Sequence, residues 1–125
     1  MRARAWLLAL VLCSSSGAQS VLDFDDWMQD IDAGNQELQR RIDKRDADSA
    51  QQRARELADL YARMEQFFLE RREPAPDAVR WSREGRDFAT QALADLEARR
   101  FGAARRNALA IAHGCRDCHH QYKPL

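Results

Sequence analysis

The chain carries the sequence Cys115-Arg116-Asp117-Cys118-His119 near its C-terminal end, which is a Cys-x-x-Cys-His motif. This motif is typical of c-type haem attachment, in which two thiols add across the two vinyl groups of a haem and the adjacent imidazole ligates the iron. In a helix with about 3.6 residues per turn, positions i, i+3 and i+4 share one face, so both sulfurs and the ring can meet one flat macrocycle. The motif therefore predicts one covalent haem c, anchored by Cys115 and Cys118, with His119 as the proximal iron ligand.

A structural zinc site and a redox dithiol also use paired cysteines. Zinc usually takes four protein ligands, and only His113 and His120 lie near enough in the sequence to complete a local set. A dithiol motif of the thioredoxin kind belongs with a βαβ pattern, which this chain lacks. A haem-free helical binding or zinc module is therefore the less favoured alternative.

The first residues have the three-part layout of a secretory signal peptide. Arg2 and Arg4 make a positive start, nine apolar residues follow, and small residues occupy positions 14–18. Nine apolar residues are too few to cross a bilayer. We expect cleavage after Ala18 and export of residues 19–125 to the periplasm, without membrane insertion of the mature chain. Lipidation at Cys13 is a weaker alternative, because Leu12 stands where a small residue is expected.

Charge and cysteine content limit the class of protein further. Without residues 1–18 the chain has 107 residues, and its 18 basic side chains face 20 acidic ones, a formal charge of −2. The two signs are interspersed along every segment, which argues against a nucleic-acid binder and predicts solvated faces along residues 40–55 and 63–86. Only Cys115 and Cys118 remain as thiols after cleavage. No constellation of a catalytic acid, base or nucleophile is visible, so we do not expect an enzyme.

The elements that must position the motif are helices. Apolar residues recur every three or four positions, and glycine and proline are scarce. Pro74 and Pro76 interrupt the pattern once, and Asp48 or Ser49 could cap the helix before them. The expected helices cover approximately residues 23–43, 49–71, 76–98 and 103–122, with a short turn at 99–102. Four such helices with short joins predict one all-α domain, an antiparallel up-down-up-down four-helix bundle around the covalently bound haem.

This arrangement resembles the cytochrome c-prime family of exported four-helix-bundle haem proteins, in which the attachment motif lies on the last helix. The resemblance covers essentially the whole mature chain. It rests on the C-terminal motif followed by Tyr122-Lys123, on Trp81 with Phe88 seven residues later, and on Met28 in the first helix. It implies haem surroundings that include Trp81, Phe88 and Lys123.

Members of that family differ at the sixth iron position, which is either vacant or filled by a methionine of the first helix. By resemblance Met28 is the distal ligand, and the chain is an electron carrier of the low-spin kind. The alternative is a five-coordinate haem protein that binds nitric oxide or carbon monoxide, with Met28 as ordinary core filling. Met64 has no family counterpart as a ligand and is expected to pack the core.

The resemblance also bears on contacts and partners. Family members often have a basic residue near the haem propionates at the position of Phe24, so that contact does not carry over to this chain. Redox partner proteins are implied by electron transfer. Family members often form homodimers through their first two helices. In this sequence no apolar stripe is clearly left over once the core is accounted for, so a homodimer is implied by the resemblance alone.

Overall fold

The computed structural model describes residues 21–122, with side chains from Asp23 onward. Within this range the chain forms four helices and no strand. The helices are α1 (Val21–Asp43), α2 (Ala47–Leu69), α3 (Pro76–Glu97) and α4 (Phe101–Gln121). The all-helical prediction is confirmed, and the expected bounds differ from these by two residues or fewer. The expected signal peptide and Lys123 lie outside the described residues.

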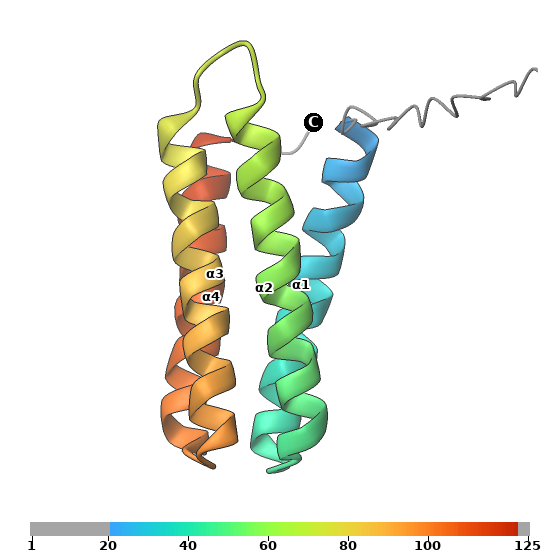
Figure 1. The fold of residues 1–125 in the computed structure, drawn as a ribbon, viewed down its shortest axis with the longest axis vertical. Coiled ribbons are helices and arrows are strands. Elements are labelled where there is room, and N and C mark those ends of the chain that lie inside the picture. The colour runs from blue at the N-terminus through green and yellow to red at the C-terminus, as the bar shows by residue number, and fades with distance from the viewer. Residues whose placement is uncertain (1–20, 123–125) are drawn as a thin grey trace, which may run out of the picture.

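The helices lie side by side around a shared core. Helix α1 packs against α2 and α4, and α3 packs against the same two helices. The α1–α2 and α3–α4 turns lie at the lower end of Figure 1, and the longer α2–α3 connection lies at the upper end. This arrangement is consistent with a four-helix bundle. None of the described helices is long and apolar enough to be a candidate membrane span.

The core combines a few large side chains with many alanines. Leu38, Leu57 and Leu96 are completely buried, and burial of each such side chain contributes about 1.5–3 kcal/mol to folding. The small core residues let the helix backbones approach closely. They are Ala50, Ala54, Ala89, Ala92, Ala104 and Ala108, all fully buried.

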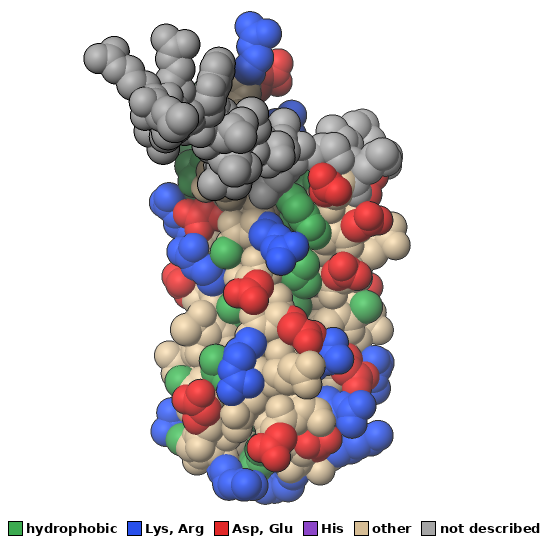
Figure 2. All heavy atoms as spheres, turned by 45° about the vertical axis from the view of Figure 1, so that its right-hand side comes forward, with side chains coloured by type: hydrophobic (Ala, Val, Ile, Leu, Met, Phe, Trp, Pro, Cys, Tyr) green, Lys and Arg blue, Asp and Glu red, His purple; other side chains and the backbone are tan. Residues whose placement is uncertain are grey.

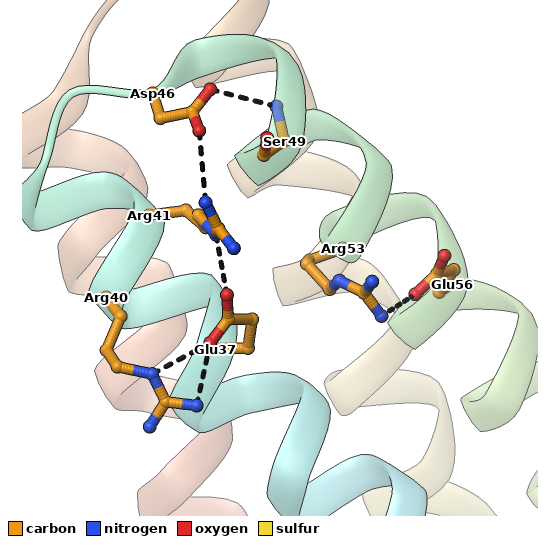
Figure 3. A network of polar contacts seen from close by, with 7 residues as sticks. All are labelled: Glu37, Arg40, Arg41, Asp46, Ser49, Arg53 and Glu56. Carbon is orange, nitrogen blue, oxygen red and sulfur yellow. Dashed lines mark hydrogen bonds and ion pairs between the residues drawn. The ribbon is translucent and has the colours of Figure 1, made fainter.

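The turn between α1 and α2 is fixed by an acidic cap and by ion pairs. Asp46, rather than the expected Asp48 or Ser49, is the N-cap of α2: its carboxylate accepts a hydrogen bond from the Ser49 backbone N–H at 3.3 Å. Arg41 donates to the same carboxylate at 3.3 Å and to Glu37 at 2.5 Å. Figure 3 shows this chain of contacts running from α1 across the turn to the first residues of α2. The prediction of the cap was wrong by two or three residues, because the chain leaves α1 with Arg45 in a left-handed conformation (φ 54°) and enters α2 sooner.

The turn between α3 and α4 uses a buried carboxylate. Asp95 is 4% exposed, and its two oxygens accept hydrogen bonds from Arg100 at 2.9 Å and from Asn107 at 2.9 Å. Arg99 supplies the left-handed residue here (φ 55°), and α4 then begins at Phe101. The observed turn between Glu97 and Phe101 is therefore shorter than the turn predicted at 99–102.

The outer faces carry both charge signs. In Figure 2 acidic and basic side chains are interspersed over the visible described surface, and hydrophobic side chains lie between them, several adjoining one another just below the grey atoms. The prediction of solvated faces fails at Glu65, which is 8% exposed on α2. Arg83 and Arg86 of α3 hold its carboxylate at 2.5 and 2.7 Å, so this acid joins two helices.

Candidate functional site

The C-terminal half of α4 forms one wall of a pocket in the upper half of the bundle as drawn in Figure 1. The six described residues of the predicted haem site all line this pocket. They are Met28 from α1, Trp81 and Phe88 from α3, and Cys115, Cys118 and His119 from α4. Tyr61 and Met64 from α2 complete the fourth wall. Each helix of the bundle therefore contributes to the pocket.

The imidazole of His119 is the polar group that best indicates a ligand. Its Nε2 atom is buried and has no hydrogen-bond partner among the residues that the structure describes. A buried polar atom without a partner costs free energy, and a bound ion or ligand is one of the explanations for such an atom. A ring nitrogen that lines a pocket beside two thiols has the donor character that haem iron requires. The donor set therefore fits a c-type haem.

Cys115 and Cys118 are free thiols, both partly buried. Burial raises the pKa of Cys115, and burial together with the neighbouring Cys115 raises the pKa of Cys118 to about 11. Both sulfurs are therefore protonated at neutral pH, and a protonated thiol is a poor nucleophile for disulfide exchange.

Two methionines from different helices line the pocket. Met28 is partly exposed, while Met64 is 5% exposed and belongs to the buried core. Met28 also packs against that core, so its contacts alone allow both ligation and simple packing. The core placement expected for Met64 is confirmed, and its thioether also reaches the pocket.

The aromatic wall has a component that the sequence did not indicate. Tyr61 was not singled out from the sequence, yet its hydroxyl lies 3.5 Å from Cys115 Sγ. Its ring fills the space next to Gly85 of α3. No local sequence signal could have identified this residue, because the contact joins α2 to α4 across 54 positions of the chain.

The pocket is largely apolar and has little free space. Its free volume is about 30 Å³, against about 10–15 Å³ for one water molecule. A haem macrocycle is far larger than this free volume. Gly114 lies on the pocket wall, and an added Cβ there would meet no other atom within 4 Å. That side of α4 is the one with room for close approach.

The remaining candidates lie away from this pocket. His113 and His120 are exposed, and His113 Nδ1 contacts the Arg116 guanidinium at 2.5 Å. Across residues 23–122, no three His, Cys, Asp or Glu side chains come together as a potential metal site, which the zinc alternative requires. Phe24 stacks on Phe67 with ring centroids 4.9 Å apart, so its helix position serves packing.

No known family model, no curated protein and no solved structure matches this chain.

Proposed function

We propose that this protein is a periplasmic mono-haem c-type cytochrome that carries single electrons, built as an antiparallel up-down-up-down bundle of the cytochrome c-prime type. The observation that supports it best is the buried, unpartnered Nε2 of His119 beside the two thiols of its own motif. Residues 1–18 would direct export and residues 19–125 would form the single domain. Its partners would then be redox proteins rather than nucleic acid or membrane.

In this proposal the chain's own residues perform three tasks. The S–H groups of Cys115 and Cys118 add across the two vinyl double bonds, so each sulfur gains a carbon and each hydrogen moves to the neighbouring vinyl carbon. No oxidant or reductant is consumed in that addition. His119 Nε2 supplies the proximal nitrogen, and apolar walls such as Ile31 and Phe88 exclude water. The haem itself supplies a one-electron couple, whose potential depends on ligands, burial and nearby hydrogen bonds.

Met28 is our choice for the distal ligand. Met28 of α1 lines the same pocket as His119 of α4. A thioether is a soft, neutral ligand that raises the reduction potential of a His-ligated haem. A five-coordinate, gas-binding protein is the second candidate. The packing of Met28 against the core favours it, because that packing gives the side chain a role without iron.

Absorption spectra separate these candidates. The chain is produced in a bacterial host with the haem-attachment machinery, and ferric and ferrous spectra are recorded with and without carbon monoxide. Low-spin, six-coordinate spectra that change little with carbon monoxide support electron transfer through a Met28-ligated haem. A high-spin spectrum with ready carbon monoxide binding supports the gas-binding candidate. A chain without haem after such production contradicts both and favours the haem-free module.

A further inference from the structure

Tyr61 makes a polar contact with the first cysteine of the attachment motif. Its side chain is 6% exposed, and its hydroxyl lies 3.5 Å from Cys115 Sγ, either atom being able to donate. A buried tyrosine hydroxyl normally finds a hydrogen-bond partner, and sulfur is a weak acceptor. Cys115 Sγ is the partner that this hydroxyl has.

The direction of this hydrogen bond follows from the chemistry of the two groups. Burial strongly raises the pKa of Tyr61, so the phenol keeps its proton. A thioether sulfur carries no hydrogen and can only accept. Once Cys115 is linked to a vinyl carbon, the bond can therefore run only from the Tyr61 O–H to the sulfur.

Gly85 makes the position of this tyrosine possible. A Cβ added to Gly85 would overlap the Tyr61 ring, with Cδ1 at 2.7 Å and two further ring atoms closer still. Real Cβ atoms essentially never approach other atoms so closely, and the obstructing group is a buried ring rather than a flexible side-chain end. Gly85 is itself buried in α3. The ring and the glycine thus form a matched pair between α2 and α3.

We propose that Tyr61, seated against Gly85, is a positioning residue of the haem site whose hydroxyl donates to the Cys115 sulfur. This inference deepens the proposed function and rests on it. Before attachment the contact holds the sulfur at the pocket wall while its S–H adds across a vinyl group. After attachment an O–H donated to this sulfur would bring positive charge toward the attached haem, which would stabilise its reduced form and raise its potential.

The test compares Tyr61→Phe with the wild type as haem-loaded proteins. We expect the variant to have a lower midpoint potential with an unchanged absorption spectrum, and a larger fraction of Cys115 left as a free thiol by peptide mapping. Tyr122→Phe is the matched control, because it removes the hydroxyl of the other mature tyrosine, which does not line the pocket. It should leave the potential and both thioethers unchanged.

Gly85→Ala provides an independent second variant if Tyr61→Phe does not accumulate. It keeps the hydroxyl but displaces the ring, so it should also lower the potential. A potential and a Cys115 linkage equal to those of the wild type, in whichever variant is obtained, would overturn the inference. A loss of thermal stability alone, without a change in potential, counts against it as well. A wild-type chain that carries no haem overturns the proposed function and this inference together, whereas a loaded wild type with insensitive variants overturns only the inference.

Discussion

Cys115, Cys118 and His119 supply the polar groups of the Cys-x-x-Cys-His motif at the candidate site, two thiols and one imidazole. Two partly buried thiols lie on the same pocket wall as an imidazole whose Nε2 is buried without a partner. The local spacing i, i+3, i+4 was sufficient to predict this grouping, because it depends only on helix geometry. The roles of the side chains opposite depend on the folded bundle and need direct tests.

Met28→Ala tests the distal assignment. We expect it to convert a low-spin spectrum to a high-spin one and to let the ferrous protein bind one carbon monoxide per haem, because a thioether ligand has been removed. Met64→Leu is the control, since Met64 lines the same pocket from the buried core and should keep the low-spin spectrum. A wild type that is already high-spin, or equal effects of the two substitutions, would contradict the assignment.

Tyr61 and Gly85 are two pocket residues whose roles the sequence did not predict. Met28, Trp81 and Phe88 were named in advance, by resemblance, and they do line the pocket. Tyr61 was not, because its contact with Cys115 needs three helices in register and a missing Cβ on α3. Such a contact is a product of tertiary packing, which periodicity alone does not describe.

At the scale of the elements, polar side chains at the two lower turns decide where helices begin and how they pair. The helix bounds were close to prediction because apolar periodicity and the two prolines mark them. The caps were not, because a cap depends on the backbone geometry of the turn. The sequence offered Asp48 or Ser49 as the cap of α2, whereas the left-handed Arg45 starts the helix earlier and makes Asp46 the cap.

Asp46→Ala should lower the midpoint temperature of unfolding at neutral pH, because the Ser49 N–H loses its acceptor. The hydrogen bond from Ser49 lowers the pKa of Asp46 below the usual 3.8. This stabilisation is therefore present above pH 3.8 and disappears as the pH falls through the lowered pKa of the folded state. Asp46→Asn should retain part of the cap without this pH dependence. A difference in midpoint temperature between wild type and Asp46→Ala that stays constant as the pH falls from 7 through the lowered pKa of Asp46 would contradict the role of Asp46 as the cap.

Asp95→Ala should destabilise the protein by about 1–3 kcal/mol in urea unfolding, since Arg100 and Asn107 lose a buried acceptor at the start of α4. Glu97→Ala, on the exposed end of the same helix, is the matched control and should change stability by about 0.5 kcal/mol or less. Equal effects of the two changes would show that the buried carboxylate does not join α3 to α4.

At the scale of the whole molecule, the candidate pocket and the core share the same region. The pocket is lined by buried core residues such as Ile31 and Ile111, and its free volume is only about 30 Å³. A haem seated there would replace side-chain contacts with contacts to the macrocycle. The four-helix fold was predictable because it follows from the spacing of apolar residues along the sequence and from the short connections. The small free volume of the pocket was not predictable, because it depends on how the side chains pack.

The haem-loaded protein should therefore be more stable than the unloaded chain. We expect the loaded wild type to unfold at a higher urea concentration than the Cys115→Ser/Cys118→Ser double variant, followed by far-ultraviolet circular dichroism, because a ligand bound in the core stabilises the folded state by linkage. Serine keeps the size of each side chain nearly constant. Coincident unfolding curves would show that the macrocycle does not form part of the core.

The most direct measurement is the absorption spectrum of the denatured wild-type polypeptide after production with the haem-attachment machinery. Our account predicts a Soret band that stays with the chain in denaturant, a mass increased by one haem, and loss of both in the Cys115→Ser/Cys118→Ser double variant. A denatured chain with no Soret band and two free thiols would contradict it.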